Sequence, residues 1–259
     1  MNRPPLPRLK PGERLLLCLD YDGTLVPLQK RPELAVIHPA VKKLLEELSA
    51  LSNMTVAMIS GRELANIKKM VGVKGLIYAG THGMEIRGPK GMVSIKRPSE
   101  KERLALKNAW RALNEGTKNL SGTFAEKKKM ALAAHYRNAP KGIPASLAKL
   151  AADTAETYNL RMKKGKKVFE LLPYGARDKG GALSWIREQL TRRYGAKPLA
   201  VYIGDDLTDE DAFRELGGRD LPIIVRSRRK TLARYRLSGI PSTISYLTAL
   251  KTSLRCRAD

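Results

Sequence analysis

The chain has few cysteines, few aromatic residues and no long apolar run. Its two cysteines, Cys18 and Cys256, are too few for a disulfide framework, and we expect both to be plain thiols. No apolar run approaches the ~20 residues of a membrane-spanning helix, and residues 1–8 lack the apolar stretch of a secretory signal. These absences argue against membrane and secreted classes, so we expect a cytoplasmic protein.

Acidic residues are also scarce. Against 49 lysines and arginines stand 25 aspartates and glutamates, which leaves a formal charge of +24 and implies anionic partners. The basic runs 163–167 and 226–230 allow nucleic-acid phosphate contacts, but a basic field that attracts a small phosphorylated substrate fits equally well. Base stacking needs aromatic residues among the basic ones, and these make 5% of the chain. We therefore favour the small substrate.

Apolar strands alternate with amphipathic helices over much of the chain, which predicts an α/β fold with a doubly wound parallel (Rossmann-like) sheet. The expected strands are 15–19, 55–59, 75–79, 199–203 and 221–225, and the expected helices are 39–51, about 62–70 and 181–194.

Residues 99–172 interrupt this alternation with the pattern helix, strand, strand, repeated once. The first helix begins with a capping box at Ser99 and Glu102 and is expected to stop at Gly116. One hairpin pairs 124–126 with 130–137, where Met130, Leu132 and Tyr136 are expected to be buried. Then come a helix led by Pro144 and a second hairpin turning at 164–165. We therefore predict a catalytic core, residues 1–98 and 173–259, with an inserted α+β cap domain, residues 99–172, that acts as a lid.

Four separate segments end a strand or open a helix with a group suited to phosphoryl transfer. Asp20 and Asp22 follow the first strand and face the same way, as candidate nucleophile and candidate acid and base. Ser60 offers a hydroxyl to a phosphate oxygen, Lys179 a fixed cation, and the pair at 205–206 metal-binding carboxylates. Because open α/β sheets bind ligands beyond the carboxyl ends of their strands, we expect these groups to meet there.

The same segments resemble the haloacid dehalogenase superfamily, whose phosphatases share Asp-x-Asp-Gly-Thr, a later Ser or Thr, a Lys and Gly-Asp-Asp. The resemblance extends over about residues 13–250 to trehalose-6-phosphate phosphatases, most specifically through 202–213 (Tyr-Ile-Gly-Asp-Asp-Leu-Thr-Asp-Glu-Asp-Ala-Phe). The other matching segments are 19–25, 59–62, 80–85, 134–137, 168–173 and 178–180.

By this resemblance, Asp20 attacks phosphorus and forms an aspartyl-phosphate, while Asp22 protonates the leaving sugar oxygen and then activates water. Mg²⁺ is held by the Asp20 carboxylate, the Asp22 backbone carbonyl and Asp205. Ser60 and Lys179 complete the phosphate cradle. Asp206 and Asp209 would orient Lys179 or the metal-bound waters.

The resemblance also implies a set of sugar contacts: His82, Glu126, Lys128, Arg137, Lys166 and Glu170. The sequence does not decide which lysine makes two of these contacts. Lys127 and Lys129 flank Lys128, and Lys167 follows Lys166.

The implied activity is Mg²⁺-dependent hydrolysis of trehalose 6-phosphate to trehalose and phosphate, the last step of trehalose biosynthesis. One alternative is a phosphatase for another sugar phosphate, such as sucrose 6-phosphate or a glycosyl-phosphoglycerate. A more distant one is a basic nucleic-acid-binding protein, which would be expected to have lost Asp20, Lys179 or Asp205. We expect the chain to act alone, without the synthase domain that is fused in some relatives, and as a monomer.

Overall fold

The computed structural model describes residues 2–29, 31–165, 167–226 and 229–255. The chain divides into two compact units: a first unit of residues 1–95 and 177–259, and a second unit of residues 96–176. The divisions predicted from the sequence lie after residues 98 and 172. The roles of the two units as catalytic core and lid stay predictions.

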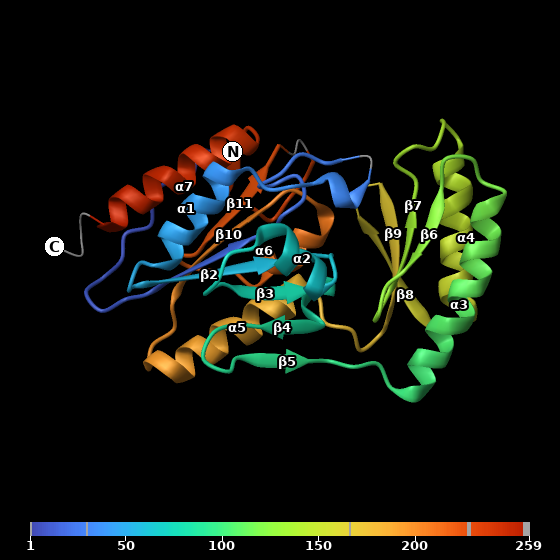
Figure 1. The fold of residues 1–259 in the computed structure, drawn as a ribbon, viewed down its shortest axis with the longest axis horizontal. Coiled ribbons are helices and arrows are strands. Elements are labelled where there is room, and N and C mark those ends of the chain that lie inside the picture. The colour runs from blue at the N-terminus through green and yellow to red at the C-terminus, as the bar shows by residue number, and fades with distance from the viewer. Residues whose placement is uncertain (1, 30, 166, 227–228, 256–259) are drawn as a thin grey trace. The chain divides into compact units, whose positions relative to one another are not determined.

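The first unit is built on a sheet of eight strands in the order β12-β11-β10-β1-β2-β3-β4-β5 (Figure 1). Neighbouring strands from β12 to β3 run parallel, and β4 and β5 add an antiparallel hairpin at one edge. The strands are β1 Leu15–Leu19, β2 Met54–Ile59, β3 Ile77–Gly80, β4 Glu85–Arg87, β5 Val93–Ile95, β10 Leu199–Gly204, β11 Leu221–Val225 and β12 Tyr235–Leu237. The predicted α/β class with a parallel sheet is confirmed.

Helices cover both faces of this sheet, because alternate residues of each buried strand enter different cores. Leu15, Leu17 and Leu19 of β1 pack into a cluster with α1 and α7, whereas Leu16 and Cys18 pack into a second cluster with α5. The helices are α1 Pro39–Ser49, α2 Leu64–Val71, α5 Lys179–Tyr194, α6 Glu210–Arg214 and α7 Ile240–Arg255, with single turns η1 Pro32–Leu34, η2 Thr81–Gly83 and η3 Leu207–Asp209. None of the helices among the described residues is both long enough and apolar enough to span a bilayer.

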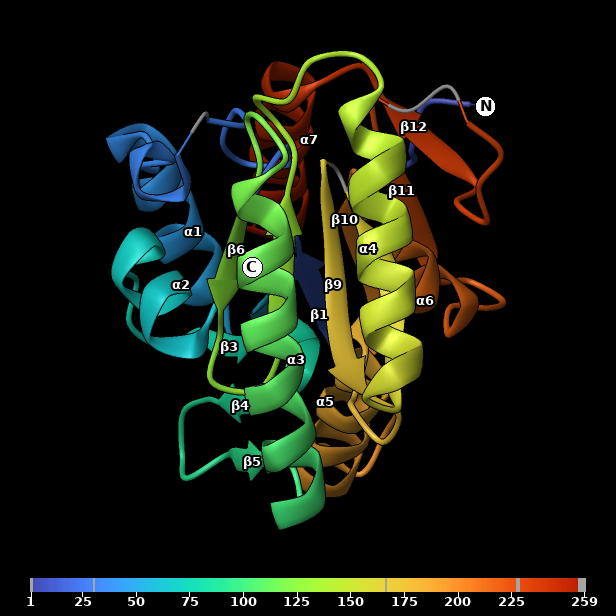
Figure 2. The same cartoon turned by 90° about the vertical axis from the view of Figure 1, so that its right-hand side faces the viewer.

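The second unit is a four-stranded antiparallel sheet with both of its helices on one face (Figure 2). The strand order is β6-β7-β9-β8, and the core forms between the helices and alternate strand residues such as Ala134, Phe169 and Leu171. The elements are α3 Glu100–Lys118, β6 Phe124–Lys127, β7 Leu132–His135, α4 Ile143–Thr157, β8 Leu160–Gly165 and β9 Val168–Pro173.

Two local predictions in the second unit are wrong. Helix α3 does not stop at Gly116, where an added Cβ would lie 2.6 Å from Leu150 Cδ2, so the glycine lets α3 and α4 pack closely. Strand β8 continues through Gly165, so the second hairpin reverses later than 164–165. The expected burial of Met130, Leu132 and Tyr136 is confirmed, and the intervening Ala131 and Ala133 are buried as well.

Candidate active site

The expected catalytic groups meet at one edge of the first unit's sheet, where neighbouring parallel strands end side by side. Leu19, the last residue of β1, pairs with Ile203 of β10 and with Met58 of β2. Asp20 follows β1, Ser60 follows β2, His82 lies in η2 after β3, and Asp205 follows β10. Because these strands are parallel neighbours, the four residues lie at the same carboxyl edge of the sheet.

Lys179 joins this edge from the first turn of α5 and makes two buried ion pairs. Its Nζ donates to Asp20 Oδ1 at 2.8 Å and to Asp209 Oδ1 at 2.7 Å. Burial disfavours the ammonium, but attraction to the two carboxylates outweighs it and raises the pKa of Lys179. Burial raises the pKa of the Asp20 carboxyl well above its usual range, and Lys179 opposes that rise. The lysine is therefore a permanently charged group beside Asp20.

Asp209 accepts several of the hydrogen bonds that hold this cluster together. It has no exposed surface, and its Oδ1 also accepts the Tyr202 hydroxyl at 2.8 Å. Its Oδ2 accepts the backbone N–H groups of Asp205 at 3.0 Å and of Asp206 at 2.8 Å. Burial, together with the neighbouring Asp209 charge, raises the pKa of Tyr202 well above normal, so its hydroxyl remains a donor. Asp209 thus ties Lys179 to the turn that carries Asp205, and the sequence motif gave no role to Tyr202.

The acidic side chains here can hold a metal ion. Carboxylate oxygens of Asp20, Asp205 and Asp209 lie within 4.8 Å of one another, and all three residues are buried. Three carboxylates face one ammonium, an excess of negative charge that a divalent cation would balance, and hard oxygen donors are the ligands that Mg²⁺ prefers. Gly23 makes room for the Asp205 carboxylate, because a Cβ at Gly23 would lie 2.1 Å from Asp205 Oδ2. The residues present therefore fit such an ion.

The Asp22 carboxylate does not join this cluster but is bound by Arg62. Arg62 Nε donates to Asp22 Oδ2 at 2.6 Å and Nη2 donates to Oδ1 at 2.7 Å, a bidentate pair. Arg62 Nη1 also donates to Asn66 Oδ1 at 2.9 Å, on α2. Burial opposes the guanidinium charge, but Asp22 outweighs it and raises the pKa of Arg62. The motif Ile-Ser-Gly-Arg contains this arginine, although the sequence assigned it no role.

The turns after β2 and β3 are tied together around Ser60 and His82. Ser60 is buried, its Oγ accepts the Arg62 N–H at 3.1 Å, and its carbonyl accepts the His82 N–H at 2.9 Å. The His82 ring lies against Gly61, where a Cβ would come 2.8 Å from Cε1. Thr81 and His82 both have left-handed backbone angles, with φ of 46° and 57°. This pair of turns holds His82 beside Ser60.

The second unit gathers polar residues on the face of its sheet that the helices leave uncovered. Glu126, Ala133 and Glu170 lie opposite one another on β6, β7 and β9, and the residues next to them along the strands pack against α3 and α4. Lys128 Nζ donates to Glu170 Oε1 at 2.7 Å. His135 Nε2 contacts Glu126 Oε2 at 2.8 Å. This hydrogen bond lowers the pKa of Glu126 despite partial burial.

The pleat separates the lysines that the sequence left open. Lys128 lies on the polar face with Glu170, whereas Lys127 Nζ lies 5.3 Å from the Trp110 ring centroid on α3. Lys129 is exposed, and Arg137 is partly buried two residues past β7. Lys166 lies outside the described residues, while Lys167 Nζ lies 5.8 Å from the Tyr136 ring centroid. In the first unit, Asp206 contacts Arg229 at 3.7 Å, and it is Asp209 that contacts Lys179.

A family model described as trehalose-phosphatase matches residues 18–240. Over 240 residues, 91% of this chain, the sequence is 32% identical to the trehalose-phosphate phosphatase of Mycobacterium tuberculosis, and it spans 61% of that protein. It is 36% identical over 256 residues to an uncharacterized glycosyl hydrolase of M. tuberculosis, of which it spans 19%. The chain thus spans less than two thirds of the length of these curated relatives.

Solved structures show the same fold. The C-terminal domain of Candida albicans trehalose-6-phosphate phosphatase aligns with a TM-score of 0.81 at 24% identity, covering 93% of each chain. Aspergillus fumigatus trehalose-6-phosphate phosphatase aligns with a TM-score of 0.62 at 28% identity, again covering 93% of each chain.

Proposed function

The chain belongs to the trehalose-phosphatase family, and we propose on that premise that it hydrolyses trehalose 6-phosphate to trehalose and inorganic phosphate. The observation that carries the proposal is the buried cluster of Asp20, Lys179 and Asp205 at the carboxyl edge of a parallel sheet. Phosphoryl transfer uses a carboxylate as nucleophile, a fixed cation that binds the phosphate, and further carboxylates that hold a metal ion.

In the first step, a carboxylate oxygen of Asp20 attacks phosphorus and the bond from phosphorus to the sugar oxygen breaks. The Asp22 carboxyl gives its proton to that departing oxygen, which leaves as the hydroxyl of trehalose. In the second step, the Asp22 carboxylate removes a proton from water, whose oxygen attacks phosphorus and releases phosphate from Asp20. Arg62 makes a bidentate contact with Asp22, and this contact must open before Asp22 can give a proton to the sugar oxygen in the first step.

The other groups of the first unit bind the phosphate. The Ser60 hydroxyl and the Lys179 ammonium would contact its oxygens, and Asp209 keeps Lys179 charged and aimed. The Asp20 carboxylate, the Asp22 carbonyl and Asp205 would hold Mg²⁺, which supplies neutralisation of charge on the transferring group. Asp206, bound to Arg229, would support the same turn.

The second unit would recognise the sugar. A carboxylate accepts hydrogen bonds from two hydroxyls, and a charged donor makes the stronger hydrogen bonds. Glu126, Lys128 and Glu170 present both kinds of group on one face, as support for this role. Arg137, Lys166 and His82 complete the proposed set of sugar contacts.

We also propose that the enzyme works as a cytoplasmic monomer. Cys18 is a buried free thiol, which fits a reducing compartment. Light scattering of the purified protein measures the oligomeric state.

A panel of phosphate esters tests the activity. Phosphate release is measured for trehalose 6-phosphate, sucrose 6-phosphate, a glucosyl-phosphoglycerate and p-nitrophenyl phosphate, each with Mg²⁺ and with excess EDTA. We expect the highest kcat/KM for trehalose 6-phosphate and loss of release in EDTA. A clear preference for another sugar phosphate would overturn trehalose 6-phosphate as the substrate, and full activity in EDTA would overturn the role of Mg²⁺.

A further inference from the structure

The polar face of the second unit carries an exposed aromatic side chain that the proposed mechanism does not use. Phe124 opens strand β6, the outer strand of the sheet, and 45% of its surface is exposed. Leu104, Met162 and Tyr174 of this unit are exposed as well, so it is the position of Phe124 in the sheet, and not its exposure alone, that indicates a role.

Phe124 stands on the same face as the proposed sugar contacts. It precedes Glu126 by two residues, and successive residues of a strand point to opposite faces, so both leave the sheet on the side away from the helices. Its direct partner across β7 is His135, whose ring stacks on it at 4.5 Å between centroids with 16° between planes. His135 in turn contacts Glu126 Oε2 at 2.8 Å.

This neighbourhood holds the two kinds of group that bind a sugar ring. A pyranose presents hydroxyls around its rim and an apolar face of C–H groups, so a site needs hydrogen-bonding groups and a flat apolar surface together. The charged side chains of Glu126, Lys128 and Glu170 supply the first. Phe124 supplies the second, with its orientation fixed by the stacked His135.

We propose that Phe124 is the platform on which a pyranose ring of the substrate lies, and that the Phe124–His135 stack selects a sugar phosphate over a simple phosphate ester. This inference rests on the proposed function and adds a specificity-determining residue to it. Phe124 touches the sugar, whereas His135 is a positioning residue that acts through Phe124 and Glu126.

Kinetics of Phe124→Ala in the full chain tests the platform. A stacked ring is worth on the order of 1 kcal/mol, so we expect kcat/KM for trehalose 6-phosphate to fall about fivefold to tenfold, mainly through KM. Trehalose as a product inhibitor should weaken by the same factor, while inhibition by inorganic phosphate and hydrolysis of p-nitrophenyl phosphate stay unchanged. Phe124→Trp, which keeps a flat ring, should restore wild-type values.

Met162→Ala is the matched control. Met162 is 38% exposed, lies on β8 at the other edge of the same sheet, and pairs with Leu171, whose side faces the helices. Met162→Ala should leave kcat/KM, KM and both inhibition constants unchanged. Equal losses for both phosphate esters in Phe124→Ala would mean a folding role and overturn the platform, as would an unchanged KM for trehalose 6-phosphate. Wild-type protein without trehalose-6-phosphate hydrolysis would overturn the proposed function itself.

Discussion

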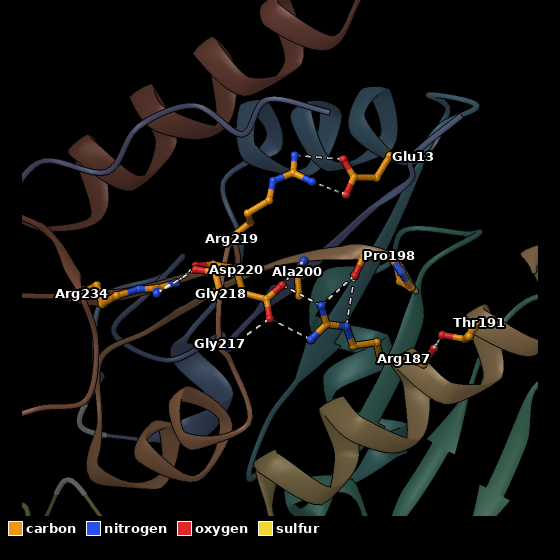
Figure 3. Close-up of polar contacts among 10 residues, drawn as sticks. All are labelled: Glu13, Arg187, Thr191, Pro198, Ala200, Gly217, Gly218, Arg219, Asp220 and Arg234. Atoms are coloured by element: carbon orange, nitrogen blue, oxygen red, sulfur yellow. Dashed lines mark hydrogen bonds and ion pairs between the residues drawn. The ribbon is translucent and has the colours of Figure 1, made fainter. Parts of the chain in front are cut away.

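Two buried clusters of opposite charges involve helix α5, one at its first turn and one at its middle, and they differ in how their charges are matched. Lys179, in the first turn, faces Asp20 and Asp209, with Asp205 close by. Arg187, two turns later, faces the single carboxylate of Asp220, which precedes β11 at the amino edge of the sheet (Figure 3). The first cluster has more carboxylates than cations, and the second is balanced.

The balanced cluster is also saturated with hydrogen bonds. Asp220 accepts two from Arg187, at 2.7 and 2.9 Å, one from the Ala200 N–H and one from the Gly217 N–H. Arg187 donates further to the Pro198 carbonyl. A cavity of about 570 Å³ opens beside it, but this pair is already satisfied from within the protein. Such a network suits a structural role, whereas excess charge at the carboxyl edge suits a site completed by a ligand.

Asp20→Asn should give the largest effect of this comparison. The change keeps the shape of the side chain but removes the proposed nucleophile, so phosphate release from trehalose 6-phosphate should fall on the order of 10⁵-fold. The free energy of unfolding should not fall, because removing the charge of one of three close carboxylates reduces the repulsion among them. Release assays and urea unfolding measure both. Near-normal Mg²⁺-dependent release by the folded variant would rule out the covalent mechanism.

Asp220→Ala should show the reverse pattern. It leaves the buried Arg187 charge without its carboxylate, which costs about 3–5 kcal/mol of the free energy of unfolding. Measured at a temperature where the variant remains folded, kcat for trehalose 6-phosphate should stay within about twofold of wild type. The double variant Arg187→Met, Asp220→Leu should recover part of the stability, because no unpaired charge remains. A large loss of kcat with unchanged stability would erase the distinction between the two clusters.

Glu170→Ala tests whether the Lys128–Glu170 pair of the second unit is structural or binds the substrate. This pair is balanced and buried like Arg187–Asp220, yet it lies on the face that the helices leave open. If it recognises sugar hydroxyls, kcat/KM for trehalose 6-phosphate should fall by about 2–4 kcal/mol, roughly 30-fold to 1000-fold. Hydrolysis of p-nitrophenyl phosphate should change little. Equal losses for both substrates would place Glu170 with the structural pairs.

The smallest effect should come from salt. The net charge of +24 is expected to attract a dianionic substrate, and the Debye length is about 10 Å at 0.1 M salt. Raising the ionic strength with KCl from about 0.05 to about 0.3 M should lower kcat/KM severalfold and leave kcat nearly constant. Salt-sensitive, length-dependent binding to DNA or RNA at physiological salt would instead assign the charge to nucleic acid.

Much of the catalytic edge could be predicted because its signals are local. Asp20 and Asp22 follow an apolar strand, and parallel strands bring their carboxyl ends together without further information. The roles of Arg62 and Tyr202 could not be predicted, because each depends on a partner from a different turn of the chain. The short β4 and β5 and the edge strand β12 were missed, since three residues carry too little periodicity.

The sequence by itself determined the α/β alternation, the inserted helix-strand-strand repeat and the candidate catalytic residues, because each is written in spacing along the chain. Only the tertiary structure decided which of three adjacent lysines joins Glu170, because the pleat sends Lys127 and Lys128 to opposite faces. It also decided that Gly116 lies within a helix, because helix α4 approaches it there. Contacts between distant segments set these outcomes, and spacing along one strand or helix does not contain them.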